Sequence, residues 1–450
     1  MRLIHRWLKS PALASVRRTR LDHVAFSIAD QGFSVGGMFL ANVALARAAS
    51  KEEYGMFTLA YSVFNFLTGL HNAAILEPYT VYGAGRYRNH TPEYRWLIWR
   101  SNAWLGVVLT ALLLLVWLVL TWTVPSLGSR SMLGLAVSCA IILTSYVLRR
   151  LLYIERKVGL AAKMSFVFLL TLTILLGVSM KRESLDGMSV FIIVALASIA
   201  GCLVALREVP RRISLHGFYE AQPGHWSEHW KYARWVLATA FVFQLANQAY
   251  YWLVAGLLSL KEVAELRAIT MIVMAVDQVF IAITFLVLPM LAARYASKQI
   301  GELFSLWKVY LLAFLLIGGA FVAAVLLLGG PVMHWIYGGK FDDVAGLLPR
   351  LALLPVLMGI GHTMNVALKS VEKPNMVFYA YVASGATTFA VGIPLMIHLG
   401  LRGAAYGMLM SAGVYTVTLG IAFLRHMPRL HRLGMANRQE EVVVGQSGAA

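Results

Sequence analysis

Apolar residues fill almost the whole chain in long stretches separated by short polar loops. A helix of about 20 apolar residues spans the hydrocarbon core of a bilayer, so each stretch predicts one membrane crossing. Twelve crossings are expected, at residues 23–46, 54–82, 99–122, 131–153, 160–179, 188–206, 233–258, 265–291, 307–330, 347–369, 377–399 and 402–424. The pattern therefore predicts an all-α integral membrane protein.

The second of these crossings carries polar side chains that a helix facing lipid would not hold. With about 100° between successive residues of a helix, five of them fall on one narrow stripe. These five are Tyr61, Asn65, Thr68, Asn72 and Tyr79. His71 and Glu77 lie off the stripe and are expected to pack against other helices. Polar groups at membrane depth mark a cavity or a pathway, so the stripe is interpreted as one wall of a transport cavity.

Three other crossings contribute candidate cavity residues. The first contains Asp30, and two later crossings contain Gln244, Asn247, Gln248 and Tyr251, and then Thr270, Asp277 and Thr284 at steps of seven residues. A carboxylate at membrane depth is costly unless it is paired, protonated or hydrated. Asp30 is open to two interpretations: a site for a coupling ion, a proton or a sugar hydroxyl, or a structural carboxylate capped by neighbouring hydroxyls or an interfacial water. For Asp277 the functional interpretation is favoured.

Composition supports this picture and sets the orientation. Hydrophobic residues make up 59% of the chain and charged residues 13%, whereas soluble domains have about 25% charged residues. The net charge of +18 comes from basic residues in short loops, which argues against a nucleic-acid partner. With the N-terminus in the cytoplasm, inside segments hold 29 of the 39 Lys and Arg residues. This bias predicts that both termini are cytoplasmic.

The longest interior loop divides the chain into two groups of six crossings. The expected organisation is a basic N-terminus at 1–22, a six-helix bundle at 23–206, a loop at 207–232, a second bundle at 233–425 and a cytoplasmic tail at 426–450, disordered after Arg438. Ser50-Lys51-Glu52 and Leu260-Lys261-Glu262 precede corresponding crossings, offset by 210 positions. Many transporters are built from such repeats, with the substrate bound between the halves.

Arginines near the predicted cytoplasmic ends of the crossings have two interpretations. Most are expected to anchor the orientation of their helices. Four could also contact an anionic substrate at the cytoplasmic vestibule, because the guanidinium group binds phosphate oxygens in pairs. These are Arg86, Arg100, Arg149 and Arg150.

Several classes of protein are not supported by the sequence. The patterns GxxxxGK[ST], HExxH and GxSxG are all absent, and no long loop could carry a catalytic domain. The cysteines, Cys139 and Cys202, both lie inside predicted crossings, which leaves no disulfide framework or metal-ligand spacing. We therefore expect a protein that is not an enzyme and has no metal site or cofactor, with coupling to H⁺ or Na⁺ left open.

Several stretches resemble a known family. The elements are Leu45-Ala46-Arg47, then Lys51-Glu52-Glu53, then Tyr54-Gly55-Met56-Phe57, followed much later by segments 335–355, 365–385 and 401–407. Together they are similar to the Wzx-like polysaccharide flippases of the multidrug/oligosaccharidyl-lipid/polysaccharide (MOP) exporter superfamily.

The resemblance implies two six-helix bundles around a central cavity lined by crossings one, two, seven and eight. It also implies flipping of undecaprenyl-diphosphate-linked oligosaccharides from the inner to the outer leaflet of the bacterial inner membrane, by alternating access, for exopolysaccharide, capsule or O-antigen synthesis. The expected partners are the lipid-linked substrate, membrane lipids and glycan polymerase or export machinery, and the protein is expected to be a monomer. Two alternatives stay open: a multidrug or small-cation exporter of the same superfamily, and a membrane partner in glycan assembly that transports nothing.

Overall fold

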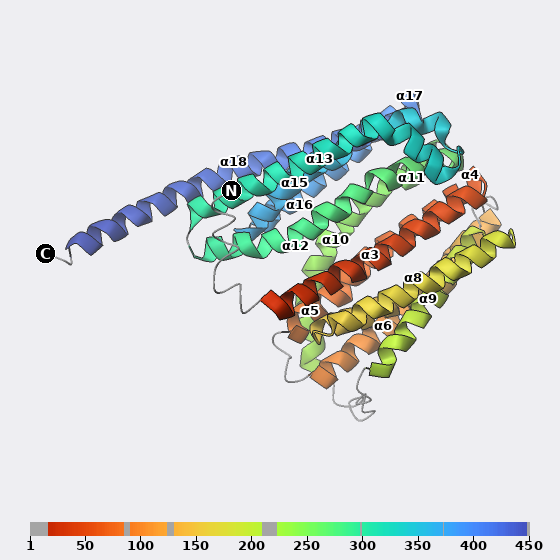
Figure 1. Cartoon of the computed structure of the whole chain (residues 1–450), viewed down its shortest axis with the longest axis horizontal. Helices are drawn as coiled ribbons and strands as arrows, with labels where there is room; N and C mark the ends of the chain where they lie inside the picture. Colours follow the sequence, from red (N-terminus) through yellow and green to blue (C-terminus); the bar gives the residue numbers. More distant parts are fainter. Residues whose placement is uncertain are drawn as a thin grey trace. The chain divides into compact units, whose positions relative to one another are not determined.

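A computed structural model describes residues 17–84, 91–123, 130–208, 223–297, 299–371 and 373–447. All regular secondary structure in these ranges is helical, which confirms the predicted fold class. The chain forms two compact units, Met1–Phe241 and Val242–Ala450. Their boundary falls inside α10, Pro223–Leu257 (Figure 1). Because α10 begins at Pro223, the last part of the segment predicted as a loop at 207–232 is helical.

The described helices form twelve consecutive helical stretches that coincide with the twelve predicted crossings. In the first unit they are α3 Arg17–Ala48; α4 Lys51–His71, the π-helix η1 Asn72–Leu76 and α5 Glu77–Ala84; α6 Thr91–Thr123; α7 Arg130–Ile154; α8 Val158–Lys181; α9 Gly187–Glu208; and the first part of α10. The second crossing is thus one helical stretch with a π-helical turn in its middle.

The second unit begins within α10 and has three interrupted crossings of its own. Its elements are α11 Leu260–Val273, α12 Ala275–Ala296, α13 Ile300–Tyr337, the 3₁₀ turn η3 Asp342–Leu347, α14 Leu348–Leu351, α15 Leu353–Ser370, α16 Pro374–Thr387, the π-helix η4 Thr388–Gly392, α17 Ile393–Leu399 and α18 Leu401–Ser447. The prediction of a disordered tail after Arg438 is wrong, because α18 continues to Ser447. The tail begins with Gln439, Glu440 and Glu441, which favour helix, and hydrophobicity alone does not detect this preference.

Matching helix starts mark corresponding positions in the two units. Ser50 caps α4 by accepting a hydrogen bond from the Glu53 backbone N–H, and Ser259 caps α11 in the same way with Glu262. This is the capping box, Ser-x-x-Glu. The two serines are 209 positions apart (259 minus 50), and α6 and α13 begin at the same offset (300 minus 91). The equal spacing supports the internal repeat predicted from the sequence.

Close helix packing within the first unit depends on small residues. α3 packs along α8, and α7 and α8 both pack on α9. A Cβ atom added at Gly134 of α7 would lie 2.8 Å from the Met188 Cα atom, and one added at Gly201 of α9 would lie 2.8 Å from the Met164 carbonyl oxygen. Glycine lets the backbones approach this closely, as in other membrane helix bundles.

Eight of the described helical stretches are long and apolar enough to cross a membrane, so the chain is a multi-pass membrane protein. The stretches α3, α4 to α5, α10 and α11 to α12 are not among the eight. These four are the stretches in which the sequence predicted polar cavity residues. In contrast, α6 leaves large apolar side chains exposed, among them Trp104, Val107 and Trp122, as expected of a helix that faces lipid.

Candidate functional site

The first unit buries a carboxylate among four donors. Asp30 of α3 is fully buried, and the Arg149 guanidinium of α7 donates two hydrogen bonds to its Oδ2 atom, at 2.9 and 2.6 Å. The Tyr153 hydroxyl donates to the same oxygen at 2.6 Å, and the Ser165 hydroxyl of α8 donates to Oδ1 at 2.5 Å. Helix α7 brings Arg149 and Tyr153 together because residues four apart share one helix face. The two hydroxyls match the interpretation of Asp30 as a capped structural carboxylate, and the sequence did not predict its pairing with Arg149.

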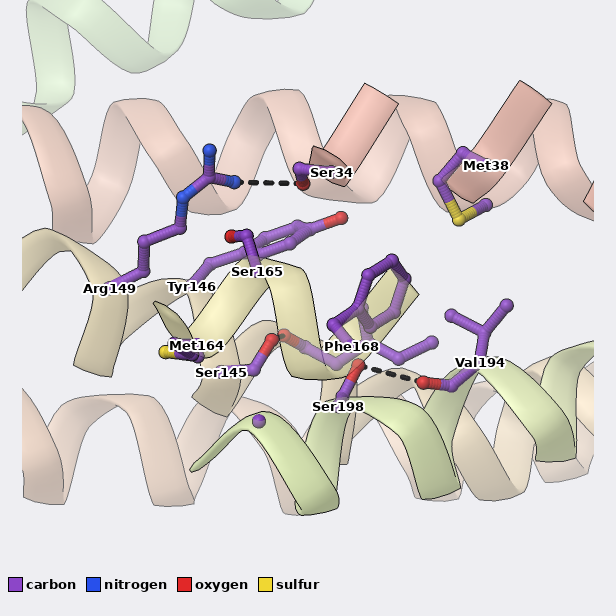
Figure 2. A pocket seen from close by; sticks show the side chains of 12 residues that line it. Ser34, Met38, Ser145, Tyr146, Arg149, Met164, Ser165, Phe168, Val194 and Ser198 are labelled. Carbon is purple, nitrogen blue, oxygen red and sulfur yellow. Dashed lines mark hydrogen bonds between the residues drawn. The ribbon is translucent and has the colours of Figure 1, made fainter. Parts of the chain in front are cut away.

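Arg149 connects this ion pair to a small cavity lined by serines and by apolar side chains. Its guanidinium also donates to the Ser34 hydroxyl at 2.9 Å and to the Gln31 side-chain oxygen at 3.3 Å. Figure 2 shows the Arg149 side chain reaching toward Ser34 above the cavity, with Ser145 and Ser198 on its far side. The cavity has a volume of about 30 Å³, which is enough for one or two water molecules. The sequence placed Arg149 at an anion-binding vestibule, whereas the structure pairs it with a carboxylate.

The neighbouring arginine has a different environment. Arg150 is half-buried, and its guanidinium donates to the side-chain oxygen of Asn72 at 3.1 Å. Among the described residues it makes no ion pair with a carboxylate within 4.0 Å. Asn72 is the first residue of the π-helix η1, and it belongs to the stripe predicted from the sequence. The structure therefore joins one predicted cavity residue to one predicted anion contact.

The other four residues of the predicted stripe on the second crossing do not share one environment. Tyr61 and Asn65 are half-buried, and the buried Thr68 hydroxyl has no hydrogen-bond partner among the described residues. Tyr79 is 1% exposed and packs against the Tyr94 ring of α6, with ring centroids 6.0 Å apart, so its prediction as a stripe residue is wrong. The π-helix is the physical reason. Its wider turn rotates every later residue away from the positions expected for a regular α-helix.

The residues predicted to lie off the stripe do pack against other helices. The buried His71 Nε2 atom lies 2.8 Å from the Asn102 side-chain oxygen of α6, and Glu77 accepts a hydrogen bond from the Tyr232 hydroxyl at 3.3 Å.

The seventh crossing contributes a polar cluster in the second unit. The Tyr251 and Thr270 hydroxyls lie 2.9 Å apart, and the buried Arg267 guanidinium lies over the Tyr251 ring. Gln244 is half-buried, and the buried side-chain oxygen of Gln248 has no partner among the described residues. Asn247 is exposed and donates to the Phe243 carbonyl of its own helix.

The eighth crossing does not present the single face that the sequence predicted. Thr270, Asp277 and Thr284 follow seven-residue steps, but the helix is interrupted between α11 and α12 at Met274, so the straight-helix projection is wrong. Thr284 instead lies within 2.7 Å of the Tyr310 hydroxyl and 3.0 Å of His362 Nε2. Asp277 is half-buried, and its carboxylate accepts no hydrogen bond among the described residues.

Of the remaining vestibule arginines, Arg100 is exposed on α6 and joins none of these clusters, and Arg86 lies outside the described residues. Within the described part of the chain, no group of three His, Cys, Asp or Glu side chains is placed to hold a metal ion.

Sequence reasoning did not select Tyr153 and Ser165 as partners of Asp30. The spacing of Tyr153 four residues after Arg149 was an available signal. Ser165 offered none, because an apolar helix tolerates isolated serines at many positions.

The fold matches solved structures of one class of membrane transporter. The inward-facing conformation of a multidrug resistance MATE family transporter of the MOP superfamily aligns with a TM-score of 0.78 and 13% identity, over 90% of this chain and 99% of that chain. The outward-facing conformation of a multidrug resistance MATE family transporter of the same superfamily gives 0.63 and 13%, over 91% and 96%. A MOP superfamily transporter from Pyrococcus furiosus, described as having a binding pocket of reverse polarity that suggests a different function, gives 0.62 and 12%, over 91% and 95%.

No protein-family profile and no curated protein matches the sequence. At these identities the structural likeness establishes the fold. The chain is a multi-pass membrane protein with the fold of the MATE transporters of the MOP superfamily.

Proposed function

We propose that this protein is a MOP-type transporter that flips undecaprenyl-diphosphate-linked oligosaccharides from the inner to the outer leaflet of a bacterial inner membrane by alternating access. The observation that carries the proposal is the charge balance of the first unit. Arg149 neutralises Asp30, while the half-buried Arg150 is held by the neutral side chain of Asn72. Among the described residues, Arg150 has no carboxylate within 4.0 Å, so its guanidinium can accept an anionic substrate.

A half-buried guanidinium that has no carboxylate within 4.0 Å suits a diphosphate. Burying a charge without a counterion is costly, and an anionic ligand removes that cost when it binds. Arginine also forms paired hydrogen bonds with phosphate oxygens, and the Asn72 side chain can take part in binding sugar hydroxyls.

The physical task fits such a site. A headgroup of sugars and diphosphate cannot cross hydrocarbon unaided, because each polar group would lose its hydrogen bonds to water. The polyprenyl tail can stay in lipid while the headgroup passes through a polar interior.

One observation favours a second candidate function. The Asp277 carboxylate accepts no hydrogen bond among the described residues, which suits a cationic substrate or a coupling H⁺ or Na⁺. Export of a small organic cation is therefore the alternative, and the fold is compatible with both.

Reconstitution in proteoliposomes separates the candidates. The first measurement is the rate at which an undecaprenyl-diphosphate oligosaccharide changes leaflet, for the wild-type protein and for Arg150→Gln. A matched control is Arg182→Gln, since Arg182 is an exposed arginine at the C-terminal end of α8. A charge-assisted hydrogen bond contributes about 1.5–3 kcal/mol, so Arg150→Gln should slow flipping about 10- to 100-fold, with the control unchanged.

The opposite pattern of results identifies the alternative. If the wild-type protein moves ethidium but not the lipid-linked oligosaccharide, and if Asp277→Asn abolishes that movement, the protein is a cation exporter. If neither compound moves under any pH or sodium gradient, the transport proposal is refuted.

A further inference from the structure

The second crossing contains a proline that removes one backbone donor from the helix. Pro78 has no N–H group, so it cannot donate to the carbonyl of Ala74 four residues earlier, as an ordinary helical residue would. Just before it, the helix widens into the π-helix η1, in which the Glu77 N–H donates to the Asn72 carbonyl five residues back. The Ala74 carbonyl is therefore short of its usual α-helical partner.

A histidine from the start of α10 supplies a donor to this carbonyl. His229 Nε2 lies 2.8 Å from the Ala74 oxygen, and His229 Nδ1 lies 2.9 Å from the Tyr94 hydroxyl. A carbonyl can only accept, so Nε2 carries the hydrogen, and in the neutral ring Nδ1 then accepts from Tyr94. Both His229 and Tyr94 are 1% exposed. This geometry makes the imidazole a substitute for the missing backbone N–H.

The surrounding contacts fix the orientation of the imidazole ring. The Trp226 ring lies parallel to it, with centroids 5.7 Å apart and an angle of 7° between the planes. One turn later on α10, the Tyr232 hydroxyl donates to the Glu77 carboxylate at 3.3 Å. The start of α10 is thus held on the same turn of the second crossing by two separate side chains.

The π-helix places the only side chain that holds Arg150 among the described residues. Asn72 opens η1, and its side-chain oxygen accepts from the Arg150 guanidinium at 3.1 Å. A change from π-helical to regular α-helical backbone rotates side chains around the helix axis. The position of the Asn72 side chain therefore depends on the turn that contains the Ala74 carbonyl.

We propose that His229 is a positioning residue: by donating to the carbonyl left free by Pro78 it holds the π-helical turn, which in turn holds Asn72 against Arg150. The anionic ligand of Arg150 rests on the proposed function, whereas the hydrogen bond and the π-helical turn do not.

A simpler alternative is that His229 only anchors α10 to the second crossing. The two alternatives differ in how they depend on residue 78. If His229 replaces a missing N–H, then restoring an N–H at position 78 makes the histidine dispensable. If His229 is only an anchor, replacing it has the same effect whether residue 78 is proline or alanine.

The experiment uses full-length protein in nanodiscs with five variants: Pro78→Ala, and His229→Leu and the control Tyr232→Phe, each alone and in the Pro78→Ala background. Tyr232→Phe removes the other contact of α10 with this turn and leaves the Ala74 carbonyl untouched. Amide hydrogen exchange across residues 72–84 reports the turn. Calorimetric titration with inorganic pyrophosphate reports the Arg150 site, with Arg150→Gln as its reference.

His229→Leu is expected to raise exchange about five- to tenfold across residues 72–77 and to weaken pyrophosphate binding by a similar factor, because a buried acceptor loses its donor. In the Pro78→Ala background both effects should fall below twofold, and Tyr232→Phe should behave alike in both backgrounds. The proposal is overturned if His229→Leu leaves exchange unchanged, or if its effect has the same size in both backgrounds.

The pyrophosphate titration separates this inference from the proposed function. If the wild-type protein binds no pyrophosphate, the proposed anion site fails, and hydrogen exchange alone then decides whether His229 holds the turn. If pyrophosphate binds through Arg150 but does not respond to His229→Leu, the positioning role is refuted while the anion site stands.

Discussion

Removing one member of the Asp30–Arg149 pair should destabilise the first unit more than removing both. Arg149→Met leaves a carboxylate that is fully buried and takes away two of its four hydrogen bonds. Breaking a buried ion pair from one side costs about 3–5 kcal/mol. Asp30→Asn should cost less, because Arg149 keeps 18% of its side chain exposed and retains Ser34 as an acceptor.

The double variant Asp30→Asn, Arg149→Met leaves no charge without a partner, so its loss should be smaller than that of Arg149→Met alone. For a cooperative unit of 150–250 residues, 1 kcal/mol shifts the melting temperature by about 2–4 °C. Arg149→Met should therefore lower the midpoint by about 6–20 °C. The assay is thermal unfolding of the full-length protein in nanodiscs, followed by tryptophan fluorescence, for the wild type and the three variants.

The order of the midpoints decides the outcome. If the two single changes cost the same amount and their effects simply add in the double variant, the pair is not energetically coupled. The buried carboxylate would then draw its stability from Tyr153 and Ser165 rather than from the guanidinium.

Three further predictions concern separate contacts. Asn102→Leu should lower the stability by about 1–3 kcal/mol, because the buried His71 loses its partner, and the same thermal assay measures this. Gly134→Ala should cost about 1–3 kcal/mol, since the added Cβ would lie 2.8 Å from the backbone of α9, whereas Gly177→Ala, with nothing within 4 Å, should not destabilise. Burial lowers the pKa of His229 below its usual 6.5, opposed by the hydrogen bond to the backbone. Its contribution to stability should therefore be lost as the pH falls below about 6.5, where the unfolded chain takes up the proton first, and His229→Leu should remove that dependence in melting curves between pH 5 and 8.

Hydrophobicity alone was enough to locate the twelve helical stretches, because lipid forces every crossing to satisfy its backbone internally. It located the polar helices as well, since amides and carboxylates are rare at membrane depth. The sequence could not predict which helix face a side chain occupies after an irregular turn. Tyr79 left its predicted stripe after η1, and Thr284 left its predicted face after the break at Met274.

The sequence also did not predict which residues far apart along the chain are partners. Asp30 and Arg149 were each selected as functional, on separate grounds, and nothing in their spacing indicated that they are partners. Pro78 was a usable signal, because a proline inside an apolar helix predicts a distorted turn and a carbonyl without its donor. The sequence did not reveal that the donor would be a histidine from 155 positions away.

The buried ion pair also has a consequence for the order of biosynthesis. Asp30 lies in the first crossing, and its guanidinium partner is 119 residues further along the chain. A ribosome adds about 5–20 residues per second, so roughly 6–24 s pass between the synthesis of the two residues. An aspartate at the centre of a membrane helix costs about 2.5–3.5 kcal/mol. Until the fourth crossing has been synthesised, the apolar residues of the first crossing must offset this cost without the guanidinium.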